Sequence, residues 1–189
     1  MMHKILKKIV NWFNYKLVNK NFFYNNKTLE SSSVIEMKLI LQNLFNKNKI
    51  KTLIQIGAND GVSFDHLNFF IKKFGPKSIL VEPILENFDL LKKNYKNYEN
   101  IIFENSAISI NEEIKFLYKV KDDSKKYYSN HIPAIPSFDK KHLLNHGVKN
   151  SHIIRQSIKS ISLKNLFDKN KIKNLDLLYI DAEGYDGKI

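Results

Sequence analysis

The sequence contains no cysteine and a single arginine, and both shortages narrow what the protein can be. Without cysteine there is no disulfide framework, no thiolate–metal site and no thiol nucleophile, which is typical of an intracellular protein. No apolar run approaches the roughly 18 residues that a membrane-spanning helix needs. The chain has 189 residues, 43% of them hydrophobic, which is enough for one domain with its own core.

The shortage of arginine also bears on the formal net charge of +12. Of the 31 basic residues only Arg155 is an arginine, and the lysines are spread along the chain rather than gathered in one patch. Proteins that bind nucleic acids favour the bidentate guanidinium group for bases and phosphates. We therefore expect a solvated basic surface and no nucleic-acid partner.

Residues 1–30 predict a basic amphipathic N-terminal extension, because lysines alternate at helical spacing with apolar residues such as Ile5, Ile9 and Trp12. Its apolar segments are too short for a signal peptide. Such a helix can bind an anionic membrane surface, pack on the domain or form a loosely held extension. We expect a cytoplasmic protein, in which this extension is the candidate for peripheral membrane contact.

From residue 31 onward the pattern predicts alternating helices and strands. Ser33 and Glu36 have capping-box spacing at the start of a helix that leads into the first strand. The predicted strands are residues 52–56, 78–83, 101–104 and 175–180, and the helices between the first three are residues 63–74 and 84–95. This alternation predicts an α/β fold with a mostly parallel sheet and helices on both faces.

Within the domain 31–189, an insert at about residues 111–162 interrupts this alternation of helices and strands. Residues 113–120 alternate like an antiparallel strand, residues 151–163 suggest another extended piece, and a short helix is expected near 163–167. The insert contains four candidate general bases and three aromatic candidates for a substrate pocket, although loop packing explains them as well. These are His131, His142, His146 and His152, and Tyr127, Tyr128 and Phe138.

Three polar clusters follow predicted strands at their carboxyl ends: Gly57–Gly61, Glu82–Pro83 and Asp181–Glu183. Ligands of doubly wound sheets bind at such ends. Glu82 lies 25 residues after Gly57, and a carboxylate at this place accepts hydrogen bonds from ribose hydroxyls. A cofactor with a ribose is therefore expected.

The loop "GANDG" distinguishes between such cofactors. It lacks the middle glycine of a dinucleotide-binding loop, and Asp60 places negative charge where a pyrophosphate would lie. S-adenosyl-L-methionine has a ribose but no phosphate, and it carries a sulfonium and an ammonium group that suit an acidic loop. We expect it as the cofactor, with Asn59 and Asp60 in polar contact and Gly57 and Gly61 allowing close approach.

With "IQIGANDG", "LVEP", "NSAIS" and "YIDAEGYD" in this order, the chain from Lys51 onward resembles the FkbM family of S-adenosylmethionine-dependent methyltransferases. The resemblance implies a Rossmann-like class I methyltransferase fold and O-methylation of a hydroxyl on a sugar, glycan or related natural product. By position it also implies the site residues. For the cofactor these are Gly57, Ala58, Asn59, Asp60, Gly61, Glu82, Pro83, Asn105, Ser106 and Ala107, and near methyl transfer they are Asp181 and Glu183.

Asp181 is the expected proton acceptor for a reacting hydroxyl, since methyl transfer to oxygen needs alignment and a base. Two alternatives stay open for this acidic pair. Asp181 and Glu183 could hold a divalent cation, or Glu183 and Asp186 could only cap a following helix.

The class I sheet has seven strands, and the resemblance leaves strands five to seven without sequence in this chain. We therefore expect a truncated domain, with the strand at 175–180 exposed along one edge and open to self-association. The truncation puts the activity of this chain alone in doubt. The alternatives to a methyltransferase are a metal-dependent glycosyltransferase that uses Asp181 and Glu183, and an inactive relic or binding module.

Overall fold

The computed structural model describes residues 29–110 and 115–189. The boundary between two compact units falls between Leu44 and Phe45, inside helix α2 (Leu29–Asn46). Apart from its last two residues, the predicted N-terminal extension lies outside the described residues. Helix α2 already includes Leu29, one turn before Ser33, so the expected capping box is wrong as the helix start. Leu29 and Glu30 both have high helix propensity.

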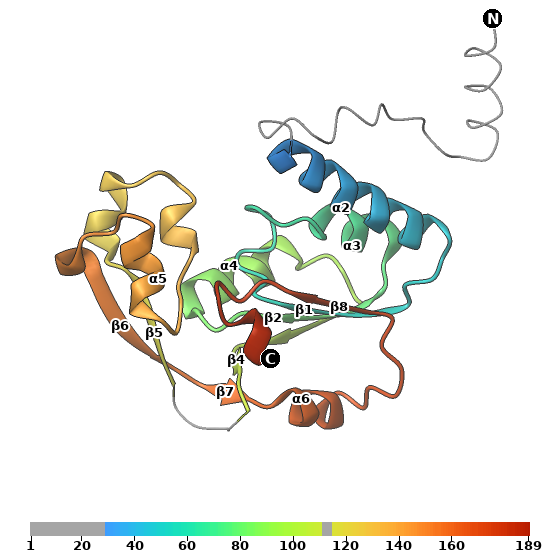
Figure 1. Ribbon diagram of the computed structural model, residues 1–189. Coiled ribbons are helices and arrows are strands. Elements are labelled where there is room, and N and C mark those ends of the chain that lie inside the picture. The colour runs from blue at the N-terminus through green and yellow to red at the C-terminus, as the bar shows by residue number, and fades with distance from the viewer. Residues whose placement is uncertain (1–28, 111–114) are drawn as a thin grey trace, which may run out of the picture. The chain divides into compact units, whose positions relative to one another are not determined.

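The second unit is built on four parallel strands in the order β3-β2-β1-β8 (Figure 1). The strands of this sheet are β1 (Thr52–Ile56), β2 (Lys77–Val81), β3 (Ile101–Glu104) and β8 (Leu177–Ile180). The first three strands lie close to the predicted ranges, and their parallel pairing confirms the expected sheet. Pro83 lies beyond the end of β2.

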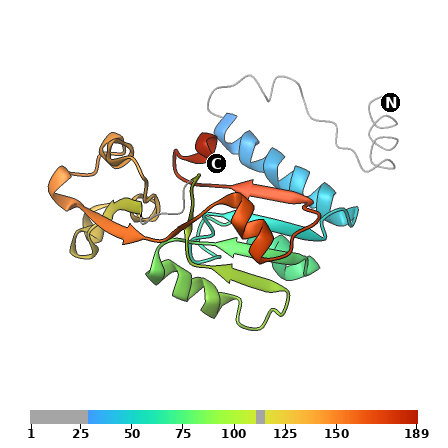
Figure 2. The ribbon, with the colours of Figure 1, turned by 90° about the horizontal axis from the view of Figure 1, so that it is seen from below.

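Helices cover both faces of this sheet (Figures 1 and 2). Helices α3 (Asn68–Phe74) and α4 (Leu85–Asn94) lie on one face, and α6 (Leu163–Lys169) lies on the other. On the α6 face, Ile54 and Ile79 are fully buried and share a cluster with Leu166. Because both faces are covered, β1 and β2 carry nearly continuous apolar runs.

The predicted insert folds mainly as an antiparallel pair, β5 (Lys115–Val120) with β6 (Ile153–Ile158). Helix α5 (Lys140–Asn145) and short 3-10 helices connect the two strands. Two short strands, β4 (Ala107–Ile108) and β7 (Ser160–Ile161), pair in parallel and join the insert to the sheet domain. The insert has a small apolar core of its own, which includes Val120 and Leu143.

Two predicted elements differ from the structure. The helix expected at 63–74 begins only at Asn68, because Phe64 has a left-handed φ of 60° and the Asp65 carboxylate accepts a hydrogen bond from the Leu67 amide. The last strand is shorter than expected and half-buried, since β1 is its one neighbour among the described strands. That three further strands are missing stays a prediction. No described helix has the length and hydropathy of a bilayer-crossing segment.

Candidate functional site

A pocket of about 230 Å³ lies where β1, β2 and β8 end. Residues that follow these three strands line it together with part of the insert, from His131 to Phe138. Nine of the twelve predicted site residues line the pocket: Gly57, Ala58, Asn59, Glu82, Pro83, Ser106, Ala107, Asp181 and Glu183. The other three, Asp60, Gly61 and Asn105, are not among the residues that line it.

Glu82 is buried at the end of β2 and faces the turn after β1. One carboxylate oxygen accepts a hydrogen bond from the Asn59 amide at 2.9 Å, and the other accepts one from the Ile84 amide at 2.8 Å. Burial raises the pKa of Glu82 to about 7 despite these two donors, and the charge of Asp60 adds to the shift. Each oxygen keeps lone pairs for a ligand that donates hydrogen bonds.

Gly57 has a φ of 81°, and a Cβ atom at this residue would lie 1.9 Å from the Asp181 carbonyl oxygen. The close approach that requires glycine is therefore between the turn after β1 and the segment after β8. The Asp181 amide also donates to the Ile56 carbonyl at 2.9 Å. Gly57 thus lets two walls of the pocket meet.

The Asp60 carboxylate forms its hydrogen bonds within its own turn, residues 60–63. It accepts hydrogen bonds from the amides of Val62 and Ser63 at 2.9 and 2.6 Å and from the Ser63 hydroxyl at 2.7 Å. Burial alone would raise the pKa of Asp60, but these donors outweigh it and lower the pKa. Gly61, with a φ of 71°, packs so tightly that a Cβ atom would lie 2.5 Å from side chains of Leu91 and Tyr95.

Asn105 fixes the end of β2 from behind the pocket. Its side-chain amide donates to the backbone carbonyls of Glu82 at 2.9 Å and Pro83 at 3.3 Å. Its neighbours Ser106 and Ala107 are buried and line the pocket. Asn105 therefore positions Glu82 and Pro83 through the backbone.

Among the pocket residues that sequence reasoning missed are two polar ones at the end of β1 and after it, Gln55 and Asp65. The Gln55 amide nitrogen donates to Asp65 Oδ1 at 3.1 Å, while Gln55 Oε1 and Asp65 Oδ2 are buried without a hydrogen-bond partner among the described residues. Burial raises the pKa of Asp65. The signal for Gln55 was a lone polar residue in the strand "TLIQI". For Asp65 there was none, since it lay within a predicted helix.

Asp181 lines the pocket and remains exposed to solvent, directly after β8. Loss of hydration on its pocket side raises its pKa, and the negative charge of Asp186 raises it further. The neighbouring Tyr179 also lines the pocket, and burial raises the pKa of its phenol to about 12. A neutral phenol and a carboxylate of raised pKa thus stand side by side at the end of β8.

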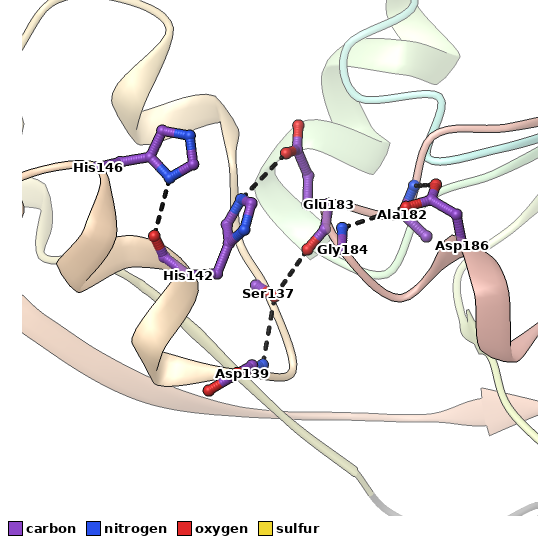
Figure 3. A network of polar contacts seen from close by, with 8 residues as sticks. All are labelled: Ser137, Asp139, His142, His146, Ala182, Glu183, Gly184 and Asp186. Atoms are coloured by element: carbon purple, nitrogen blue, oxygen red, sulfur yellow. Dashed lines mark hydrogen bonds and ion pairs between the residues drawn. The ribbon is translucent and has the colours of Figure 1, made fainter.

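Glu183 lies two residues further on, with a left-handed φ of 48°. Its side chain faces His142 of the insert, with 3.3 Å between Oε2 and Nε2 (Figure 3). Burial raises the pKa of Glu183 to about 7, and the charges of Asp181 and Asp186 add to the shift. Asp186 accepts hydrogen bonds from the amides of Ala182 and Gly184 in the turn before the 3-10 helix Asp186–Lys188. That helix has no side-chain cap, so the expected capping role of Glu183 and Asp186 is wrong, because Asp186 closes the preceding turn instead.

The charge of the pocket is opposite to the charge of the chain. Four carboxyl side chains line it, those of Asp65, Glu82, Asp181 and Glu183, and none of its described lining residues is lysine or arginine. Such a site attracts cations and repels phosphates. In residues 29–110 and 115–189 no group of three or more histidine or carboxylate side chains is arranged to hold a metal ion.

Comparison with known proteins gave a match to a family model. No curated protein and no solved structure matches the chain. The model of the methyltransferase FkbM domain matches residues 55–189, a range that includes every described residue of the pocket lining. The chain therefore belongs to the FkbM methyltransferase domain family.

Proposed function

We propose that this methyltransferase domain uses S-adenosyl-L-methionine as methyl donor and binds it at the ends of β1 and β2. The observation that carries the proposal is the charge of the pocket, with four carboxyl groups and neither lysine nor arginine in its described lining. The donor has a net positive charge and no phosphate, so this lining suits it. A nucleotide sugar or a dinucleotide would bring a diphosphate among carboxylates at a cost in Coulomb energy.

The residues present fit such a donor at two further points. Glu82 is aimed at the turn after β1 and has lone pairs free for ribose hydroxyls. Gln55 Oε1 and Asp65 Oδ2 are buried acceptors that lack a donor among the described residues, and leaving such groups unpaired costs about 1–3 kcal/mol each. An ammonium group supplies up to three N–H donors and would satisfy both.

We further propose that the methyl acceptor is a hydroxyl group on a sugar or a related natural product. When bound, the donor supplies a methyl group on a sulfonium, which an oxygen nucleophile attacks in line. Asp181 and Glu183 supply the proton acceptors beside that oxygen, and their raised pKa values make them better bases than ordinary carboxylates. Insert residues such as Pro136 and Phe138 supply an apolar wall for the acceptor.

Isothermal titration calorimetry tests the donor. We expect S-adenosylmethionine and S-adenosylhomocysteine to bind, and Glu82→Ala to weaken binding by at least tenfold. Asp89→Asn is the control, because this exposed carboxylate pairs with Lys92 on the surface of α4 and lies outside the pocket. Equal binding in Glu82→Ala and the parent, or no binding by a folded protein, contradicts the proposal.

Labelled donor and a panel of methyl glycosides then test the acceptor. Transfer of the label to a glycoside hydroxyl supports the proposal. Binding of a nucleotide sugar that depends on manganese, without binding of the methyl donor, would favour the glycosyltransferase alternative.

A further inference from the structure

Two polar side-chain contacts attach the segment after β8, residues 181–186, to the insert (Figure 3), beside the ring contact of Phe138 with Tyr185. The Ser137 hydroxyl donates a hydrogen bond to the Glu183 backbone carbonyl at 2.8 Å. His142, on helix α5, places Nε2 at 3.3 Å from Glu183 Oε2. One attachment is a neutral hydrogen bond to the backbone, and the other brings together two groups that can exchange a proton.

The His142 nitrogen that faces Glu183 has no other contact partner for its hydrogen-bonding capacity among the described residues. Nε2 is buried, and within the described part of the chain it has no hydrogen-bond partner, because the approach to Glu183 Oε2 is misaligned for a hydrogen bond. One turn further along the chain, the ring of His146 lies 4.5 Å from the His142 ring, and its Nδ1 contacts the His142 carbonyl at 2.8 Å. His146 is exposed, so the pair of rings leads from Glu183 toward solvent.

Burial and the surrounding charges shift the pKa of each member of the pair. Burial raises the pKa of Glu183 to about 7, with Asp181 and Asp186 adding to the shift and His146 opposing it. Burial lowers the pKa of His142, and His146 lowers it further.

Two carboxylates oppose that lowering: Asp139, which caps α5, and Asp186. The surroundings therefore raise the pKa of Glu183 and lower that of His142, and both shifts disfavour the charged form of the group.

We propose that Glu183 and His142 form a proton-accepting pair for the methyl-transfer site. The proposal depends on the function proposed above. As the new C–O bond forms, the C–S bond of the donor breaks and its electron pair stays on sulfur. The Glu183 carboxylate takes the proton of the acceptor hydroxyl, His142 Nε2 takes it from Glu183, and the imidazolium releases it to water.

His142 does not line the pocket, so it acts through Glu183. Its contribution is to return Glu183 to the carboxylate form, which Asp181 and Asp186 otherwise disfavour by their negative charge. A purely structural role for His142 would be to anchor the loop, as Ser137 does. The two roles differ in whether an ionisable group is needed.

Histidine-detected NMR titration decides between these roles without a methyl acceptor. The chain has six histidines, and the signal that disappears in His142→Gln identifies His142. We expect Glu183→Gln to lower the titration midpoint of His142, since it removes the carboxylate that stabilises the imidazolium. His152, whose ring contacts Tyr127 and Tyr128 instead, is the internal control and should not shift.

Ser137→Ala is the matched variant for the structural role, because it removes an anchor of the same loop but no ionisable group. It should leave the His142 midpoint unchanged. With a glycoside that accepts the methyl group, His142→Gln should lower kcat at pH 7 about tenfold and leave KM unchanged, whereas Ser137→Ala should keep the shape of the pH profile.

An unchanged His142 midpoint in a folded Glu183→Gln protein overturns the proposal, as does a kinetic effect of Ser137→Ala equal to that of His142→Gln. Calorimetry separates this failure from failure of the proposed function. If S-adenosylmethionine binds but Glu183→Gln leaves the His142 midpoint unchanged, only the proposed proton-accepting pair is wrong. If the methyl donor does not bind, the proposed function is wrong whatever the NMR titration shows.

Discussion

Glu82 and Glu183 lie on two walls of one pocket, and burial raises the pKa of each to about 7, yet their surroundings differ. Glu82 is 4% exposed, and two backbone amides donate to its carboxylate. The Glu183 side chain is 29% exposed and faces an imidazole. The same pKa shift therefore arises in two different settings. Glu82 is held in a fixed site by backbone amides, whereas Glu183 lies in an adjustable site, where it faces a side chain that can itself titrate.

The difference follows from what builds each wall. The Glu82 wall consists of strand ends in a parallel sheet, where backbone hydrogen bonds fix the geometry. The Glu183 wall consists of a loop and the insert, joined through the side chains of Ser137 and His142. A rigid wall suits the binding of a constant donor, and a wall joined by side chains suits proton transfer and a variable acceptor.

The largest effect should come from breaking the contact between the two walls at Gly57. Gly57→Ala combines a φ of 81° with a Cβ atom 1.9 Å from the Asp181 carbonyl oxygen. We expect a loss of about 3 kcal/mol or more in the free energy of unfolding, measured by urea denaturation.

Gly75→Ala is the matched control for this substitution. Gly75 also has a positive φ, of 60°, but a Cβ atom there meets nothing within 4 Å. It should cost only about 1 kcal/mol. Equal losses in the two variants would show that backbone strain, rather than the contact between the walls, decides the effect.

The second prediction concerns the pH dependence of stability. The folded-state pKa of Glu82 is raised from 4.5 to about 7, so between these pH values the folded state binds more protons than the unfolded state. The free energy of unfolding therefore falls as the pH rises from 4.5 to 7, by on the order of 3 kcal/mol for Glu82. Glu82→Gln should flatten this fall, as measured by urea unfolding across the range.

Glu183→Gln should flatten the same fall less, because solvent screens its more exposed carboxyl group. A larger effect of Glu183→Gln than of Glu82→Gln would reverse the assignment of the fixed and the adjustable wall.

The sequence predicted the Glu82 wall better than the Glu183 wall, and the reason is physical. Alternating apolar strands and helices determine a parallel sheet, and parallel strands bring their carboxyl ends to one edge. The turn at Gly57 and the side chain of Glu82 could therefore be placed together from the sequence alone. Their neighbour Asp65 could not, because the helical pattern of residues 63–74 concealed a left-handed Phe64.

The partner of Glu183 had no comparable signal. His142 is 41 residues away in the sequence, in an insert without periodicity long enough to fix its fold. Four histidines there were equal candidates, and the choice of His142 depends on how α5 lies against the loop after β8. Contacts between irregular segments depend on tertiary packing, which no local pattern encodes.

A third prediction sharpens the role of the Glu82 wall by separating binding from stability. Asp65→Asn keeps an oxygen for the hydrogen bonds from Gln55 and the Leu67 amide but removes the buried charge. We expect the free energy of unfolding to change by less than about 1 kcal/mol and donor affinity to fall about tenfold, or about 1.4 kcal/mol. Calorimetry measures the donor affinity, and urea unfolding measures the free energy of unfolding. A loss of stability without a loss of affinity would make Asp65 a structural residue.

The most local effect should come from Ser137→Ala, which loosens only the Glu183 wall. The variant removes a hydrogen bond to the Glu183 carbonyl and one from the Asp139 amide, so we expect a loss of about 1–2 kcal/mol. Amide hydrogen exchange should accelerate at residues 182–186 and stay unchanged in β1, because the sheet does not depend on this bond. Ser124→Ala is the control, since Ser124 is also a buried serine of the insert but bonds to Asp123, away from the loop. Faster exchange in β1 as well would show that the two walls open together, and the distinction between a fixed and an adjustable wall would then be lost.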